Sequence, residues 1–254
     1  MILYFSGCGN SAFVANELAR LTGDRLRLLD IADDNPSWQL DADEALGIVC
    51  PVYSWDVPRV VNDYLKRLKT NRRPSYLYLV CTCGDSVGNT VESFAKFTAS
   101  LGWTLRFAHS FIMPETYVNL KSFKLDTPES ERRKIAAVRQ ALPLVAERIM
   151  RREVRFEVVK GKLPWFNTHI TNALFYKLLI TDKKFRVNSQ CVSCGICEKG
   201  CPLHNITMID GRPHWHGNCI NCMSCYHHCP KNAIHFGNAT QGKGQYYFGR
   251  RSDV

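Results

Sequence analysis

Eight of the twelve cysteines lie in two short stretches with one shared spacing. The stretches are CVSCGICEKGCP at residues 191–202 and CINCMSCYHHCP at residues 219–230. Each reads C-x2-C-x2-C-x3-C-P, a spacing that holds four-iron clusters, with the fourth cysteine of each run serving the cluster of the other run. Three closely spaced thiolates wrap one side of a cube, and the fourth must come from elsewhere. The ligand sets that this predicts are Cys191, Cys194, Cys197 and Cys229 for one [4Fe–4S] cluster, and Cys201, Cys219, Cys222 and Cys225 for the other.

Zinc binding and disulfide formation are the alternative uses of these cysteines. Structural zinc sites usually take two C-x2-C pairs rather than runs of four. Disulfides are disfavoured in a reducing compartment, and clustered cysteines more often bind metal. Because the thiolates fill both clusters, the nearby histidines are expected to be surface or packing residues; they are His204, His214, His216, His227 and His228.

A loop of small residues, SGCGNS at residues 6–11, follows an apolar stretch at the start of the chain and precedes a predicted helix. A loop of this kind can bind an anion through backbone N–H groups and the helix dipole. It lacks the Gly-Lys-Ser/Thr of a P-loop and the spacing G-x-G-x-x-G. Taken alone, it is a weak signal, and a plain tight turn would explain it nearly as well.

Two more loops follow apolar strands, PVYSWDVP at residues 51–58 and TCGDSVGNT at residues 82–90. In open α/β sheets, ligands bind at the carboxyl ends of the parallel strands, where these loops would meet. A phosphate loop, an aromatic loop and a small polar loop at one sheet edge suit a mononucleotide with a flat ring system. Trp55 could instead fill a gap under a helix, and Asp85 could only cap its turn.

The elements that must position these loops alternate along the first 115 residues or so. Apolar runs predict strands at 1–5, 25–30, 45–52, 76–81 and 104–113, and helical periodicity predicts helices at 11–21, 58–68 and 91–101. This alternation favours a doubly wound α/β fold, with a parallel five-stranded sheet covered on both faces. A further helix is expected from Thr127-Pro128 onward, kinked or split at Pro143.

With these residues in view, the first 150 residues resemble a flavodoxin. The element order and the three loops match the FMN-contacting segments of that family. The resemblance implies that Ser6, Gly7, Cys8, Gly9, Asn10 and Ser11 hold the FMN phosphate. It implies that Pro51, Val52, Tyr53, Ser54 and Trp55 border the isoalloxazine, with Trp55 or Tyr53 stacked on it. It places Thr82, Cys83, Gly84, Asp85, Gly88 and Asn89 on the other side. Cys8 stands where flavodoxins usually have threonine, and a thiol is the weaker donor.

The C-terminal part resembles the two-cluster bacterial ferredoxins, a small α+β fold. The whole chain resembles the flavodoxin–ferredoxin fusion proteins of anaerobic microbes. We therefore expect four segments along the chain: a flavodoxin-like FMN-binding domain at 1–150, an apolar connecting segment packed between domains at 151–186, a two-cluster ferredoxin domain at 187–238, and a C-terminal tail at 239–254.

The net charge of +10 is spread over several basic clusters, which are most simply solvated surface. A basic face could also dock an acidic redox protein. No nucleic-acid module and no apolar run of membrane-spanning length is present, and the first residues do not read as a signal peptide, so we expect a cytoplasmic protein. The sequence does not indicate an oligomeric state.

Two clusters and a flavin in one chain predict an electron-transfer iron–sulfur flavoprotein that relays electrons among the clusters, FMN and an external redox partner. Two alternatives stay open. One is a flavin-dependent reductase of a small molecule, although no acid–base constellation favours it. The other is a ferredoxin with a flavodoxin-like docking domain that does not bind flavin.

Overall fold

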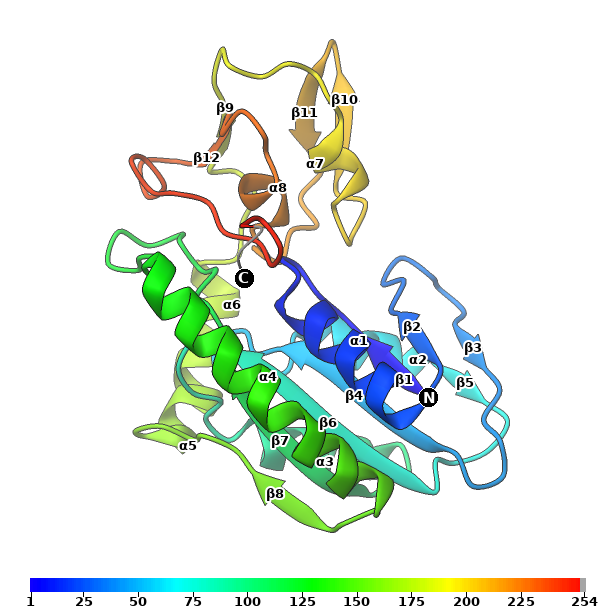
Figure 1. Ribbon diagram of the computed structural model, residues 1–254. Helices are drawn as coiled ribbons and strands as arrows, with labels where there is room; N and C mark the ends of the chain where they lie inside the picture. The colour runs from blue at the N-terminus through cyan, green and yellow to red at the C-terminus, as the bar shows by residue number, and fades with distance from the viewer. Residues whose placement is uncertain (252–254) are drawn as a thin grey trace.

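The computed structural model describes residues 1–251, which form a larger α/β domain and a smaller cysteine-rich domain above it (Figure 1). The larger domain is built on a six-stranded parallel sheet in the order β2-β1-β4-β6-β7-β8. Its strands are β1 (Ile2–Tyr4), β2 (Leu26–Leu28), β4 (Ala45–Pro51), β6 (Tyr76–Cys83), β7 (Leu105–Ile112) and β8 (Arg155–Glu157). A separate two-stranded ribbon pairs β3 (Ser37–Trp38) with β5 (Lys69–Thr70).

The first five strands of this sheet have the flavodoxin order 2-1-3-4-5. The predicted number of five was one short, because β8 extends the sheet beyond β7. This strand reads Arg-Phe-Glu, so it has no apolar run that would have predicted it. It also lies inside the stretch expected to connect the two domains.

Alternate residues of the central strands enter two separate cores. The face that carries Ile2 and Val49 packs against α1 (Asn10–Thr22) and α4 (Pro128–Met150). The face that carries Leu3 and Ile48 packs against α2 (Arg59–Arg67) and α3 (Thr90–Ser100). Burial on both sides explains why β4 and β6 are continuous apolar runs. Thr127 caps α4 through its hydroxyl, and α4 continues as one helix through Pro143, so the predicted split does not occur.

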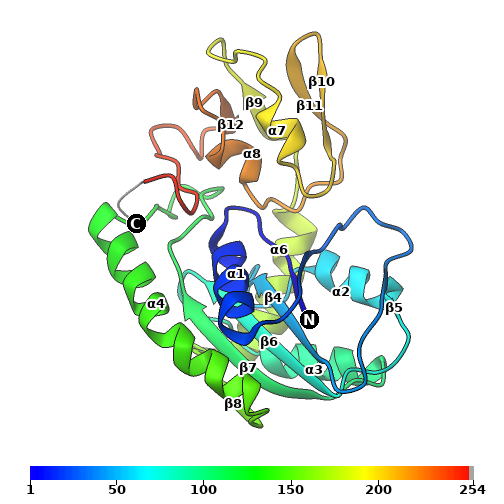
Figure 2. The ribbon, with the colours of Figure 1, turned by 45° about the vertical axis from the view of Figure 1, so that its right-hand side comes forward.

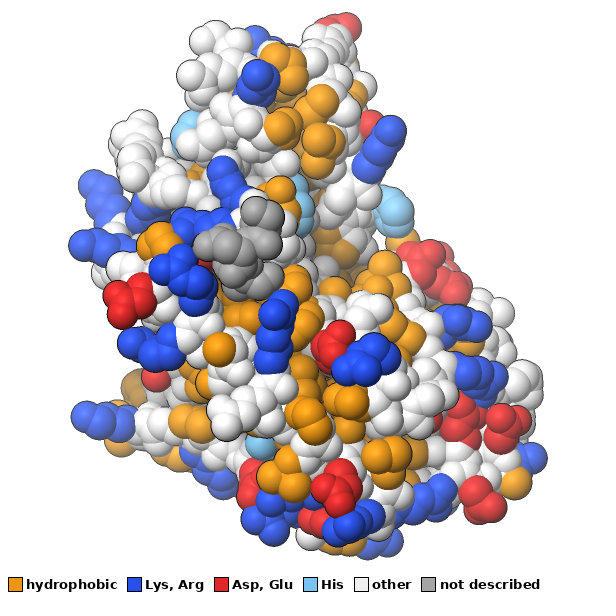
Figure 3. Space-filling view, viewed as in Figure 1, with side chains coloured by type: hydrophobic (Ala, Val, Ile, Leu, Met, Phe, Trp, Pro, Cys, Tyr) orange, Lys and Arg blue, Asp and Glu red, His pale blue; other side chains and the backbone are white. Residues whose placement is uncertain are grey.

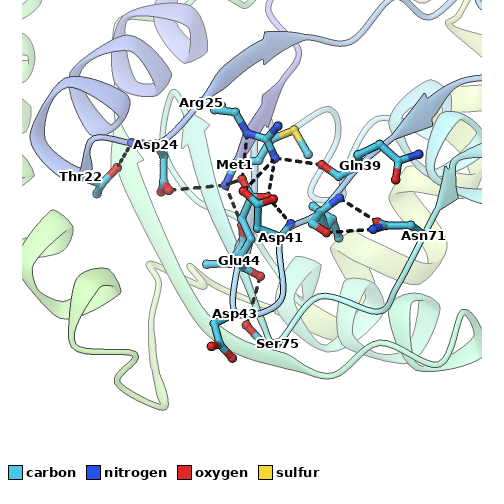
Figure 4. Close-up of polar contacts among 12 residues, drawn as sticks. Met1, Thr22, Asp24, Arg25, Gln39, Asp41, Asp43, Glu44, Asn71 and Ser75 are labelled. Atoms are coloured by element: carbon cyan, nitrogen blue, oxygen red, sulfur yellow. Dashed lines mark hydrogen bonds and ion pairs between the residues drawn. The ribbon is translucent and has the colours of Figure 1, made fainter.

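At the amino end of the sheet, opposite the loops of interest, a polar cluster ties β1 to the start of β4 (Figure 4). The Met1 amino group donates to the Ala45 carbonyl at 2.7 Å and lies 3.0 Å from the Glu44 carboxylate. Arg25 also pairs with Glu44. The hydrogen bond from Arg25 is the main effect that lowers the pKa of Glu44 to about 2, despite its desolvation. This end of the sheet is therefore closed by structural contacts.

Residues between the two domains form α5 (Pro164–Phe166), a single π-helical turn η1 (Asn167–Thr171) and α6 (Asn172–Leu178). This segment climbs one side of the larger domain to reach the smaller one (Figure 1). The smaller domain pairs β9 (Phe185–Val187) with β12 (Ile234–Phe236) and β10 (Ile206–Ile209) with β11 (Arg212–Trp215), and adds the short helices α7 (Ile196–Lys199) and α8 (Ser224–His227).

The smaller domain sits over the carboxyl edge of the sheet, above the loop that leads into α1 (Figure 2). Leu203 and Ile220 of this domain belong to the same apolar cluster as the sheet residues Phe5 and Cys50. Lys and Arg side chains gather over the upper end of α4 and the C-terminal tail and recur along the lower rim of the same face, mixed with acidic side chains (Figure 3). On this face the positive charge is thus spread over several places, as the sequence predicted.

Candidate functional site

A cavity of about 600 Å³ lies at the carboxyl edge of the sheet, between the two domains. Its volume is in the range of sites for organic ligands. It brings together most of the residues predicted from the three loops, namely Ser6, Gly7, Cys8, Asn10, Ser11, Pro51, Val52, Tyr53, Ser54, Trp55, Thr82, Cys83, Gly84 and Asp85. Gly9, Gly88 and Asn89 lie outside the lining.

The first loop has the features of an anion site. Gly9 precedes α1 in the left-handed conformation, and no side chain of residues 1–251 caps this helix end. The first N–H groups of a helix have no partners inside the helix, so here they are available to a ligand. Ser6 accepts a hydrogen bond from Gly9 N at 3.1 Å, and Ser11 bonds Thr82 of the third loop at 2.8 Å. The loop is therefore held in shape by its own hydroxyl groups.

Cys8 points toward the cysteine-rich domain. Its thiol donates to the carbonyl oxygen of Cys222 at 3.4 Å, and the side chain is buried. Burial raises the pKa of Cys8 well above its usual value, so this thiol stays protonated. Gly7 also lies against the cysteine-rich domain, because a Cβ on Gly7 would lie 3.0 Å from Cβ of Cys222 and 3.2 Å from the Tyr53 hydroxyl. The phosphate loop thus abuts a cysteine of the second run.

The aromatic loop holds two consecutive non-glycine residues in the left-handed region, Ser54 at φ 50° and Trp55 at φ 61°. Such conformations persist only where the surroundings hold them. Asn172 of α6 donates to the carbonyl oxygens of both Tyr53 and Ser54, and Thr168 of η1 donates to that of Trp55. Both η1 and α6 therefore position this loop, and π-helical turns are frequent at functional sites.

Trp55 faces the third loop, where its indole N–H donates to Ser86 at 3.1 Å. Ser86 in turn donates to Asp85 at 3.3 Å. Gly88 and Asn89 contact the connecting segment instead of the cavity: a Cβ on Gly88 would lie 2.5 Å from the Thr168 hydroxyl, which also accepts from Asn89 N. These two residues support the wall of the cavity from behind.

Several lining residues were not predicted. The loop after β7 contributes Pro114, Glu115, Thr116 and Tyr117. Its strand was predicted to end at Met113, so the rule that ligands bind at carboxyl ends would have found it. The Tyr117 hydroxyl is buried and has no hydrogen-bond partner among residues 1–251, as expected of a group that a ligand would satisfy.

Other lining residues come from the connecting segment and the smaller domain. The former gives an apolar wall that includes Leu174, Phe175 and Leu178, and the latter gives Ile220, Asn221 and Cys222. No local signal in the sequence links these residues to the three loops, because only tertiary packing brings them there. Cys222 is one of the predicted cluster ligands, so this cavity and the second cysteine set share a wall.

The cysteines of the two sets are grouped as the crossed ligand scheme requires. Cys191, Cys194, Cys197 and Cys229 line one small pocket together. Cys201, Cys219 and Cys222 lie near enough to Cys225 for their negative charges to raise its pKa, although its burial is the larger cause. The two runs also share a backbone shape, with left-handed residues on both sides of their second cysteine: Ser193 and Gly195 in one, Asn221 and Met223 in the other.

Backbone N–H groups point at several of these sulfur atoms. Asn205 N donates to Cys201 Sγ at 3.3 Å, Ala233 N to Cys229 Sγ at 3.2 Å, and Asn221 N to Cys219 Sγ at 3.3 Å. Such bonds favour thiolates and tune cluster potentials. Within residues 1–251, no three His, Cys, Asp or Glu side chains are grouped around a single-ion site.

The residues that follow β12, 237–251, connect the two domains and are called the strap below. Tyr246 donates to Asn10 of the phosphate loop at 2.7 Å, and Phe248 N donates to the Cys8 carbonyl at 2.9 Å. The ring of Phe248 stacks on Phe13 with centroids 4.2 Å apart. His227 is buried beside this strap, where desolvation lowers its pKa to about 4, and its Nε2 donates to the Thr116 carbonyl. His227 is thus a packing histidine at the domain junction.

Glu115 places a carboxylate in the cavity lining, where burial raises its pKa above the usual value. A Cβ on Gly84 would collide with this carboxylate. A phosphate bound in the same cavity would raise the pKa further, so its binding would take up a proton and the affinity would fall as the pH rises through the pKa of Glu115.

We therefore expect Glu115→Gln to bind FMN about tenfold more tightly above that pKa, which corresponds to about 1.4 kcal/mol of removed repulsion. Fluorescence titration of the flavin-free protein at several pH values measures this, with riboflavin, which has no phosphate, as the control ligand. Equal pH dependence in the wild type and the variant would contradict the prediction.

The lining of the cavity fits FMN and the two cysteine sets fit iron–sulfur clusters, which defines the protein as an iron–sulfur flavoprotein. Residues 1–123 match the model of the flavodoxin domain family, and residues 190–234 match that of the 4Fe-4S dicluster domain. The chain therefore has the organisation of a flavodoxin–ferredoxin fusion, with electron transfer as its general function. Comparison with curated proteins found no match.

Two solved structures are similar to part of this chain. The flavodoxin of Megasphaera elsdenii is 18% identical, with 55% of this chain and 99% of that one covered at a TM-score of 0.35. A protein described as a flavoprotein from Bacteroides uniformis is 14% identical, with 44% and 88% covered at a TM-score of 0.36.

Proposed function

We propose that this protein relays electrons between an external redox partner and the flavin cavity, through two iron–sulfur clusters held in a fixed order. When bound, each four-iron cluster exchanges one electron and the flavin exchanges one or two, which is the chemistry of such a relay. The chain supplies the positions of the three sites. The observation that carries the proposal is that Cys222 belongs to the second cysteine set and also lines the flavin cavity.

The ligand sets in this proposal are those predicted from the spacing. Cys191, Cys194, Cys197 and Cys229 hold the outer cluster, and Cys201, Cys219, Cys222 and Cys225 hold the inner one. Cys201 and Cys222 pack against the apolar core of the flavodoxin domain, which supports the inner position. Cys194 is exposed, which supports the outer position.

In the cavity, the N–H groups at the start of α1 together with Ser6 and Ser11 bind the phosphate. Tyr53 and Trp55 border the flat ring on one side, and Thr82, Cys83, Gly84 and Asp85 border the other. The thiol of Cys8 has a different task from the threonine of other flavodoxins, since it joins the phosphate loop to the backbone of Cys222. It acts as a positioning residue between the two sites.

The external partner docks where the outer cysteines reach the surface. Lys231 lines the pocket of the outer set, and Lys199 follows Cys197 in α7, so positive charge flanks this region. An acidic redox protein has the complementary charge. Electrostatic attraction then steers its association, and added salt weakens it.

The test begins with anaerobic purification and analysis of iron and flavin. We expect about eight irons and one FMN per chain, from two four-iron clusters and one phosphate loop. Zinc in place of iron, or two or fewer metal atoms, would rule out the ferredoxin assignment. Clusters without any uptake of added FMN would favour the alternative in which the first domain only docks partners.

The order of the sites is tested with a matched pair, Cys194→Ala and Cys222→Ala. Both variants should lose part of their iron. Only Cys222→Ala should shift the midpoint potential of the flavin, because only this residue lines the cavity. A flavin potential that responds equally to both variants would argue against the proposed order.

A reductase of a small molecule is the second candidate. The cavity continues past the three loops to the apolar wall of Leu120, Phe123, Leu174 and Leu178, which leaves room for an organic substrate beside the flavin. Steady turnover of such a substrate by the reduced protein, without a second protein, would favour this candidate.

A further inference from the structure

The outer face of the connecting segment is unusually apolar. Nine of the sixteen large hydrophobic side chains that are exposed within residues 1–251 lie between residues 154 and 178. Leu163, Phe166, Ile170, Leu174 and Leu178 recur at a spacing of three or four, which puts them on one side of the helical segment α5-η1-α6. We call these five residues, together with Trp165, the apolar stripe.

Packing inside the protein does not account for the apolar stripe. The opposite side of the segment carries the residues that hold the flavin loops, Thr168 and Asn172, and these are buried. In the stripe, by contrast, Leu163 is 70% exposed, Leu178 64% and Trp165 60%. Exposed apolar surface of this extent marks a site of interaction with a protein or a membrane.

The charges around the apolar stripe distinguish these two occupants. Residues 158–187 carry six basic side chains, of which Lys160 pairs with Glu92 of α3, and the only acidic residue in this range is Asp182. Asp182 is buried and accepts hydrogen bonds from Asn205 and Gly217 N, so its charge does not face the solvent. Lys162, Lys177, Lys183 and Lys184 are exposed. Protein interfaces are depleted in lysine, whereas interfacial membrane helices combine lysine with Trp, Phe and Leu.

We propose that the apolar stripe and its flanking lysines dock this protein on an anionic phospholipid surface. The stripe enters the boundary between headgroups and acyl chains, and the lysines contact the phosphates. Within residues 1–251, no helix has the length and apolar character to cross a bilayer, so the contact is peripheral. Leu174 and Leu178 belong both to the stripe and to the cavity lining, so the flavin cavity opens beside the lipid.

The test uses the cofactor-loaded protein and sedimentation with two kinds of vesicle, phosphatidylcholine alone and phosphatidylcholine mixed with phosphatidylglycerol. Binding to the anionic vesicles is expected, and it should weaken with salt. Trp165→Ser with Phe166→Ser should lower the affinity about tenfold or more, because two exposed aromatic anchors are lost. Neither residue lines the cavity, so bound flavin and iron should be unchanged. Membrane docking is thus tested separately from the relay.

Matched controls are available on the same chain. Leu144→Ser with Met150→Ser removes two exposed apolar side chains from α4 and should leave binding as in the wild type. Lys162→Glu with Lys177→Glu should abolish the preference for anionic vesicles, whereas Lys69→Glu with Arg72→Glu, in another region, should retain it.

Absence of binding to both kinds of vesicle would overturn the proposal, as would undiminished binding of the Trp165/Phe166 variant. A wild type that sediments as a dimer, becomes monomeric in that variant and ignores vesicles would instead identify the stripe as a contact between two copies. Salt-sensitive binding of an acidic redox protein to the stripe, without vesicle binding, would equally overturn it.

Discussion

Gly7→Ala should separate the flavin cavity from the inner cysteine set while leaving both domains folded. A methyl group there would lie 3.0 Å from Cβ of Cys222, 3.1 Å from its carbonyl oxygen and 3.2 Å from the Tyr53 hydroxyl. Three segments from different parts of the chain must then move by a few tenths of an ångström. Overpacking of this kind costs about 1–3 kcal/mol.

We expect FMN to bind about tenfold more weakly to this variant, in line with the middle of that range. Electron exchange between the inner cluster site and the flavin should slow as well, while the iron content is retained. Titration of FMN and stopped-flow absorbance of the reduced protein measure the two effects. Gly244→Ala is the control, because a Cβ there would meet the nearest described atom, Leu125 Cδ1, at 3.7 Å. Wild-type rates and affinity in Gly7→Ala would show that these loops do not abut.

Phe248→Ala should loosen the phosphate loop on the side where it contacts the residues after β12. Phe248 stacks on Phe13 of α1 and covers Gly9, where a Cβ would lie only 2.9 Å from Cβ of Phe248. Because Phe248 is half-buried, we expect the substitution to lower the free energy of unfolding by about 2–3 kcal/mol. This is near or below the lower end of the range for buried Phe-to-Ala changes.

This loss should appear as a lower denaturant midpoint for flavin release and as faster proteolysis near the strap. Leu144→Ala, on an exposed position of α4, is the control and should change neither. Flavin release at the wild-type midpoint would mean that the strap does not contribute to the site.

Local patterns were sufficient for the parts of this protein whose chemistry depends on spacing along the chain. The doubled cysteine run predicted a dicluster domain that the family comparison identifies independently. The alternation of strands and helices predicted the flavodoxin domain, and the three loop sequences predicted most of one cavity wall. In each case, the residues involved are close in sequence or are joined by regular topology.

The remaining parts depend on contacts that no local pattern contains. Thr168 and Asn172 hold the backbone of Trp55 and Ser54 across more than a hundred residues, and nothing in Thr-His-Ile-Thr-Asn indicates that partner. The residues after β12 appeared to be a plain tail, although Tyr246 and Phe248 pack on the phosphate loop. Cys8 looked like a weakened phosphate ligand, whereas its thiol bonds the backbone of a cysteine in the second run.

The strap also determines when the flavin site can be completed during synthesis. Asn10 emerges from the ribosome early, and the Tyr246 hydroxyl that binds it belongs to a residue translated 236 positions later. Between them lies the whole cysteine-rich domain, so this contact can form only after that domain has left the ribosome. The phosphate loop therefore lacks its contact with Tyr246 through most of translation.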